Sequence, residues 1–268
     1  MNDLLSALLL GLIEGITEFL PISSTGHLLI AERWLGHRSD LFNIAIQAGA
    51  ILAVVAIYRQ RLWDLLVGFA RPEHRDYAFK LGVAFAITAV GGLLVKKLGW
   101  TLPDTVRPIA WALILGGAWM LAAEQFAAKR AAALGERTAI TWSVAALVGV
   151  AQIVAGVFPG TSRSAATIFV ALLAGTTSRT AATEFAFLVG IPTMFAATGY
   201  ELLGLARHGG IGGEHWSALG VAFVASIVTA FVSVKWLLRY IQSHRFTAFA
   251  FYRFALGAAL LLLVPTGE

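Results

Sequence analysis

The chain has 268 residues, of which 58% are hydrophobic and 13% charged, and its mean hydropathy is +0.78. Soluble domains carry about a quarter charged residues, so this composition is typical of an integral membrane protein made of helices. The net charge is +5, but no basic tail or nucleic-acid-binding motif accompanies it, and we expect no nucleic-acid partner. Cysteine is absent, which excludes disulfides and thiolate chemistry.

In chain order, two hydrophobic regions are interrupted by Pro, Gly and Ser or Thr, and six are continuous. The first interrupted region is 4–20 followed by 27–35, and the second is 139–156 followed by 164–175. Irregular backbone at membrane depth is tolerated only where protein or a wet cavity surrounds it, so both regions predict re-entrant helix-loop-helix hairpins. The continuous windows predict six transmembrane helices, at 41–58, 78–95, 108–128, 184–205, 216–238 and 246–264. The predicted fold is therefore an all-α integral membrane protein.

The two halves of the chain resemble each other at an offset of 138 residues. LPISSTGH (20–27) aligns with FPGTSRSA (158–165), which matches Ser24 with Ser162, and the spans at 78 and 108 recur at 216 and 246. Each half then holds one hairpin and three crossings, and an odd number of crossings forces the second half to run upside down. We therefore predict a single membrane domain made of two inverted repeats, about 1–130 and 139–268, with a polar site at their interface.

Lys and Arg concentrate in alternate connectors. With the N-terminus outside, five lie in outer connectors and ten in inner ones, namely Arg59, Arg61, Arg71, Arg75, Lys129, Arg130, Arg137, Arg179, Arg239 and Arg245. Because cytoplasmic loops carry an excess of Lys and Arg, both termini are predicted to face the non-cytoplasmic side.

Ionisable residues interrupt the hydrophobic pattern of both hairpins. Glu14 and Glu18 are four residues apart, so both carboxylates project from one helical face. Together with Arg163 they would cost about 8–10 kcal/mol if they faced lipid, and they must instead face a hydrated cavity, each other or a bound ion. One interpretation is a structural ion pair between Glu18 and Arg163. The other is a site in which the two carboxylates bind a divalent cation, Mg²⁺ or Ca²⁺.

Hydroxyl residues lie where each short second helix begins. Such residues are most often simple helix caps, but a helix N-terminus is also a ready anion site. Arg163 adds a guanidinium whose forked donors match phosphate oxygens, so the two loops together predict a phosphate cradle. Its candidate residues are Ser23, Ser24, Thr25, Gly26, Thr161, Ser162, Arg163 and Ser164. His27, which follows within one turn, is either a satisfied structural histidine or a general acid or base.

Four stretches carry a resemblance to a known family: EGITEFLPISSTGH (14–27), PGTSRSAATI (159–168), TEFAFLVGIP and FYRF. They resemble the bacterial undecaprenyl-diphosphate phosphatase family, membrane proteins linked to bacitracin resistance. The resemblance covers nearly the whole chain. It implies hydrolysis of undecaprenyl diphosphate to undecaprenyl phosphate and inorganic phosphate, which recycles the lipid carrier for peptidoglycan synthesis. It also implies a divalent cation and a site open to the periplasmic side of the bacterial inner membrane. The functional residues it implies are Glu14, Glu18, Ser24, His27 and Arg163, with Gln47, Glu184 and Arg253 as supporting groups.

In the mechanism we expect, Glu14 and Glu18 hold the cation against the diphosphate, while Arg163 and the loop N–H groups neutralise charge on the transferred phosphoryl group. Ser24 attacks the terminal phosphorus, and His27 accepts its proton or protonates the leaving group. A water activated by Glu18 or His27 is an alternative nucleophile. The polyprenyl tail is expected in a lipid-facing groove between the repeats.

An alternative function is a lipid-phosphate flippase or transporter, because inverted repeats with broken helices are also a transporter design. A flippase has no need of the Ser24–His27 pair beside two carboxylates. The oligomeric state is not readable from the sequence, and a homodimer is one option.

Overall fold

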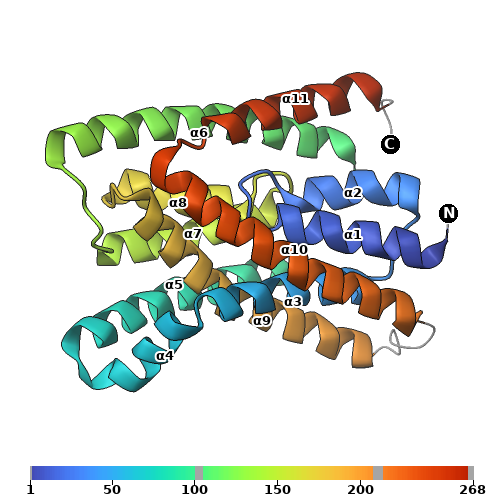
Figure 1. Cartoon of the computed structure of the whole chain (residues 1–268), viewed down its shortest axis with the longest axis horizontal. Coiled ribbons are helices and arrows are strands. Elements are labelled where there is room, and N and C mark those ends of the chain that lie inside the picture. The colour runs from blue at the N-terminus through green and yellow to red at the C-terminus, as the bar shows by residue number, and fades with distance from the viewer. Residues whose placement is uncertain (1, 100–104, 208–213, 265–268) are drawn as a thin grey trace.

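The computed structural model describes residues 2–99, 105–207 and 214–264, and within them the chain is helical with no strand (Figure 1). The helices of the first half are α1 (Asp3–Thr17), α2 (Ser24–Leu35), α3 (Asp40–Ile57), α4 (Arg59–Val67), the 3₁₀ turn η1 (Gly68–Ala70), α5 (Pro72–Lys97) and α6 (Val106–Leu134). Those of the second half are α7 (Trp142–Val157), α8 (Arg163–Ala174), α9 (Arg179–Arg207), α10 (Trp216–Ser243) and α11 (Thr247–Leu263).

Five helices among the described residues are long and apolar enough to cross a membrane: α3, α5, α6, α9 and α10. This confirms a multi-pass helical membrane protein. The sixth predicted span, 246–264, coincides with α11, which has 17 residues and a length of about 26 Å, slightly less than the roughly 30 Å hydrocarbon core. Helix α4 was not predicted, because its nine residues include charged side chains and read as a connector.

Each interrupted region forms two helices joined by a short loop. The second helix of each pair, α2 and α8, has 12 residues and is therefore about 18 Å long, too short to cross a bilayer. Each short helix packs on its partner, α2 on α1 and α8 on α7. The predicted helix-loop-helix pairs are thus formed.

Glycines bring the first helix of each pair against a helix from the other half. A Cβ on Gly11 would lie 2.2 Å from the carbonyl oxygen of Ala222, so α1 and α10 touch backbone to backbone. A Cβ on Gly149 would lie 2.7 Å from the carbonyl oxygen of Ala84, so α7 meets α5 in the same way. Small residues commonly allow such close approach between membrane helices. The two contacts are equivalent under the predicted repeat: Gly149 follows Gly11 by 138 residues, and Ala222 follows Ala84 by the same number.

The offset changes by one residue in the loops. The residue that caps α2 is Ser23 and the one that caps α8 is Ser162, whereas the sequence alignment matched Ser162 with Ser24. That match is wrong, because the second loop holds one residue more between the helix contact and the cap. Ser24 therefore corresponds to Arg163, each being the first residue of its short helix.

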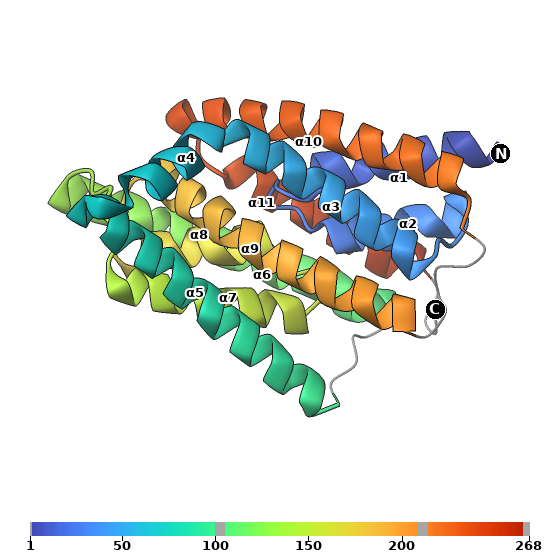
Figure 2. The ribbon, with the colours of Figure 1, turned by 90° about the horizontal axis from the view of Figure 1, so that it is seen from below.

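The two loops lie near the middle of the molecule, and α1 begins and α11 ends at the same end of it (Figures 1 and 2). Helices α6 and α11 pack together along one side, and α3 packs on α9 and α10 on the other. The largest core cluster, which includes Phe169, Phe185 and Phe246, surrounds α8. This packing places the polar loops inside the protein rather than in lipid.

Candidate active site

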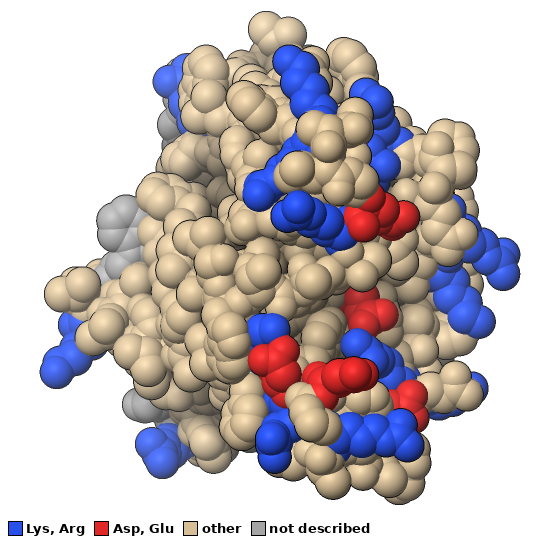
Figure 3. Space-filling model, turned by 90° about the vertical axis from the view of Figure 1, so that its left-hand side faces the viewer, with Lys and Arg blue, Asp and Glu red and all other residues tan. Residues whose placement is uncertain are grey.

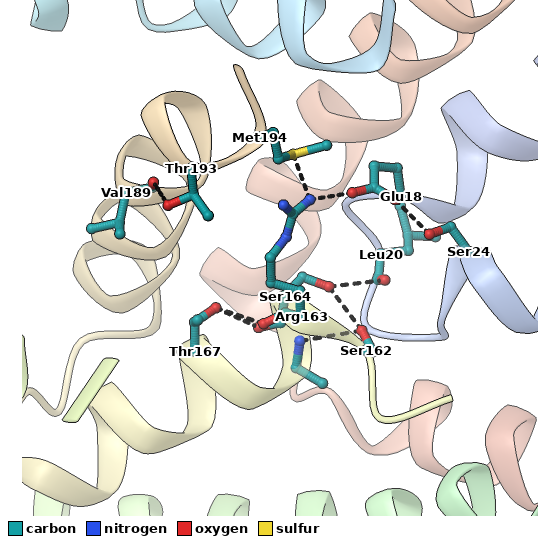
Figure 4. Close-up of polar contacts among 11 residues, drawn as sticks. Glu18, Leu20, Ser24, Ser162, Arg163, Ser164, Thr167, Val189, Thr193 and Met194 are labelled. Carbon is teal, nitrogen blue, oxygen red and sulfur yellow. Dashed lines mark hydrogen bonds and ion pairs between the residues drawn. The ribbon is translucent and has the colours of Figure 1, made fainter. Parts of the chain in front are cut away.

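The two loops meet directly, as the sequence predicts. The hydroxyl of Ser164, at the start of α8, donates to the carbonyl oxygen of Leu20 in the first loop at 3.0 Å (Figure 4). Ser164 and Ser162 also share a hydrogen bond at 3.0 Å. Segments separated by more than a hundred residues in the sequence therefore line one polar region.

Both loops end on a serine with an unusual backbone. Ser23 has φ 73° and Ser162 has φ 68°, and they are the only non-glycine residues with positive φ in the described part of the chain. Such a conformation costs about 1–3 kcal/mol. Each hydroxyl accepts a hydrogen bond from the N–H three residues later, that of Gly26 at 3.4 Å and that of Ala165 at 3.3 Å. This backbone conformation fixes the direction in which α2 and α8 begin. The N-terminal turn of each helix is suited to bind an anion.

Glu18 connects the two hairpins. Its carboxylate forms an ion pair with Arg163 and accepts a hydrogen bond of 2.5 Å from the hydroxyl of Ser24 (Figure 4). The guanidinium of Arg163 also contacts the sulfur of Met194 on α9. The ion pair of the structural interpretation is therefore present, but a purely structural pair does not require the Ser24 contact. The arrangement places a carboxylate next to a serine hydroxyl.

His27 contacts Ser23 and Tyr252 rather than the hydroxyl of Ser24, which was the contact expected from the sequence. Its Nδ1 lies 2.7 Å from the carbonyl oxygen of Ser23, and its Nε2 lies 2.6 Å from the hydroxyl of Tyr252. A carbonyl oxygen only accepts, so Nδ1 carries the ring proton and Nε2 accepts from the tyrosine. In this geometry the hydroxyl of Ser24 donates its hydrogen bond to Glu18, not to His27. No role for Tyr252 was predicted, although it lies within the FYRF motif.

Arg253, on α11, binds the backbone of both loops. Its side chain is fully buried, and its five N–H groups donate to five backbone carbonyls, those of Pro21, Ala112, Leu113, Gly160 and Thr161. A Cβ on Gly116 would lie 2.1 Å from Nη2 of Arg253, so only glycine leaves room for the guanidinium. All five donors are used in this way, so Arg253 holds the backbone of both loops and has no N–H group left for a ligand. Arg253 thus has the supporting position that the resemblance implied.

Glu14 is buried without a hydrogen-bond partner for either carboxylate oxygen among the described residues. It lies one helical turn before Glu18. A buried unpaired carboxylate is costly, and a bound cation would remove that cost. The described residues contain no group of three His, Cys, Asp or Glu side chains that could hold a metal. A cation here would need water or phosphate oxygens as further ligands, as Mg²⁺ usually does. The residues therefore fit a cation that binds together with a phosphate substrate.

The remaining predicted residues lie at different distances from this centre. Thr25 is exposed on the first turn of α2, and Thr161 contributes its carbonyl oxygen to Arg253. Gln47 lies half-buried on α3. Glu184 pairs with Arg61 of α4 at 3.0 Å, so this supporting residue belongs to a different polar cluster.

Fold and site together define a multi-pass helical membrane protein with a central polar site that joins carboxylates, hydroxyls and arginines. Residues 7–259 match the family model described as bacitracin resistance protein BacA, and the chain belongs to this family. It is 64% identical over 265 residues to the undecaprenyl-diphosphatase of Xanthomonas euvesicatoria pv. vesicatoria, covering 99% of this chain and 98% of the relative. It is 67% identical to that of Rhizobium etli, with the same coverage.

Proposed function

We propose that this chain is a membrane diphosphatase that removes the terminal phosphate of undecaprenyl diphosphate, in the site between its two loops. The family and the names of relatives above 60% identity support this activity, and with it a part in recycling the lipid carrier for peptidoglycan synthesis. The observation that carries the assignment to this site is the contact of Ser24 and Arg163 with one carboxylate, Glu18. The flippase alternative is not favoured, because the relatives are named as hydrolases.

The proposed chemistry begins with Ser24. Its oxygen attacks the terminal phosphorus while its proton passes to Glu18, and the bond from phosphorus to the bridging oxygen breaks. Glu18 returns this proton to the departing lipid phosphate. Water then attacks the phosphoserine, giving a proton through Glu18 to the serine oxygen and releasing inorganic phosphate. Arg163 and the two helix N-termini stabilise the charge on the transferred phosphoryl group.

A divalent cation, Mg²⁺ or Ca²⁺, is part of the proposal. Glu14 and Glu18 would hold it, and it would supply further positive charge to the phosphate oxygens. The unpaired, buried oxygens of Glu14 support this assignment.

The membrane arrangement that we propose has six crossings, two re-entrant hairpins and two inverted repeats. The short helices α2 and α8 support the hairpins. The matched contacts of Gly11 with Ala222 and Gly149 with Ala84 support the repeats. An apolar groove of about 670 Å³ between α1 and α10, lined by Leu8 and Leu12, is the place that we propose for the polyprenyl tail.

The orientation that we propose has both termini and the site entrance on the outer side of the bacterial inner membrane. Lys and Arg gather on the end face opposite the termini, seen in Figure 3. Positive charge on one end is the usual mark of the cytoplasmic side.

Phosphate release by purified protein from undecaprenyl diphosphate tests the activity. We expect release that stops with EDTA and returns with Mg²⁺ or Ca²⁺. Glu14→Gln should lower the rate about 10- to 100-fold and weaken the response to added cation. Lipid translocation in liposomes without phosphate release would contradict the proposal and support the flippase. Phosphate release that is unaffected by EDTA would contradict the proposed cation but not the phosphatase activity.

A further inference from the structure

Tyr252 stands immediately before Arg253 on α11 and contacts His27 of α2. The tyrosine oxygen lies 2.6 Å from Nε2 of the histidine, and the two rings are nearly parallel, 5° apart with centroids 5.6 Å apart. Because Nδ1–H of the neutral imidazole is donated to the Ser23 carbonyl, Nε2 accepts, and the Tyr252 hydroxyl is the donor. His27 is therefore held at both ring nitrogens.

We propose that Tyr252 is a positioning residue for the phosphatase reaction and that it acts through His27 on the loop before Ser24. The hydrogen bonds run from the tyrosine hydroxyl to Nε2, and from Nδ1–H to the carbonyl oxygen of Ser23. Ser23 has a strained backbone, with φ 73°, and directly precedes the serine that we propose as nucleophile. The inference rests on the proposed function of this site.

Two consecutive residues of α11 thus hold the two ends of one short segment. Arg253 donates to the carbonyl oxygen of Pro21 at 3.3 Å, while Tyr252 holds Ser23 through the histidine. A catalytic group must be kept within about 0.5 Å of its productive position, and a displacement of about 1 Å can cost a hundredfold in rate. The hydroxyl of Tyr252 therefore contributes to catalysis without touching the substrate.

A simpler explanation of Tyr252 is an aromatic anchor in the membrane, since the residue is 44% exposed and tyrosine is common at membrane interfaces. An anchor depends on the ring, which phenylalanine also has. Only the positioning role depends on the hydroxyl. Removal of the hydroxyl alone therefore separates the two explanations.

The first measurement is the steady-state kinetics of Tyr252→Phe. We expect kcat to fall about tenfold, because one hydrogen bond that fixes the loop is lost, and KM to change less than about twofold. Tyr200→Phe is the matched control: it also removes a half-exposed hydroxyl, on α9, and keeps the ring that contacts Lys96. Its kcat should equal that of the wild type. An unchanged kcat in Tyr252→Phe, or a change in KM alone, would overturn the inference.

The second measurement repeats Tyr252→Phe in two variants that lack the imidazole. His27→Ala removes both hydrogen bonds, and His27→Asn keeps an amide donor for the Ser23 carbonyl. If Tyr252 acts only through His27, its substitution should change kcat in either background less than about twofold. The same tenfold loss with and without the imidazole would overturn the inference. A wild-type protein that releases no phosphate would instead refute the proposed function.

Discussion

The two hairpins share a backbone design but not their burial or chemistry. Each has a 12-residue second helix capped by a serine with positive φ. Helix α8 is buried along most of its length, whereas α2 buries only Gly26, Leu28 and Glu32. The acidic and hydroxyl groups of the proposed reaction lie on the first hairpin, and the second contributes Arg163. The second hairpin is thus the more deeply packed and supplies a positive charge, whereas the first is more accessible and carries the proposed reactive groups.

The first residues of the two short helices show this division most clearly. Ser24 opens α2 and Arg163 opens α8, and both contact Glu18. The same position in the two hairpins holds the proposed nucleophile in one and an arginine in the other. Four sets of substitutions test how far the two halves differ.

The largest effect is expected for Ser24→Ala, which removes the proposed nucleophile of the first hairpin. We predict a loss of more than about 10³-fold in kcat, because no phosphoserine can form. Ser143→Ala, at an exposed position on the first turn of α7, is the control and should stay within about threefold. Incubation with substrate labelled with ³²P on the terminal phosphate should label the wild type and not the variant. Near-normal turnover by Ser24→Ala would instead establish direct attack by water.

Glu18→Gln should have the next largest effect. It removes the base that accepts the Ser24 proton and half of the ion pair with Arg163, and we expect kcat to fall about 10²- to 10³-fold. Glu184→Gln breaks a different ion pair, with Arg61, and should keep kcat within about twofold. Equal losses in the two variants, measured as phosphate release by protein of matched thermal stability, would mean that Glu18 is only structural.

Gly11→Ala and Gly149→Ala compare the equivalent helix contacts of the two halves. The new methyl group would meet a backbone oxygen at 2.2 Å in the first and 2.7 Å in the second, so we expect a loss of about 2–3 and about 1–2 kcal/mol of unfolding free energy, respectively. Thermal unfolding in detergent measures both. Because α1 carries Glu14 and ends directly before Glu18, only Gly11→Ala should also lower the activity of the folded protein. A similar loss of activity in Gly149→Ala would contradict the division between the hairpins.

The smallest effects are expected for Ser23→Gly and Ser162→Gly. Glycine loses the hydroxyl cap, at a cost of a few tenths of a kcal/mol, but it relieves the positive φ. We therefore predict unfolding free energies within about 0.5 kcal/mol of the wild type. Alanine at either position should cost about 1–2 kcal/mol, because it loses the cap and keeps the strain. If glycine proves as destabilising as alanine, the serine hydroxyl rather than the backbone conformation is the important feature.

Much of this site could be read from local sequence. Pro21 and Pro159 end the apolar runs, and the hydroxyl residues after them mark helix starts, so both hairpins were predicted within a few residues. The ion pair between Glu18 and Arg163 was one of the two interpretations offered by the sequence, because opposite charges that are buried stabilise each other. The hydrogen-bond partner of Ser24 was not predicted correctly. Glu18 and His27 are both only a few residues from Ser24 in the sequence, and the path of the loop decides which of them the hydroxyl contacts.

The sequence by itself determined the membrane class and the helical pairs, because hydropathy, proline and glycine act over a few neighbouring residues. Only the tertiary structure decided the role of α11, whose Tyr252 and Arg253 hold the loops of both halves. Those contacts cross more than two hundred residues of sequence in the case of His27 and Pro21. No local pattern specifies them, because a hydrogen bond to a backbone carbonyl oxygen depends on where that oxygen is placed and not on which residue carries it.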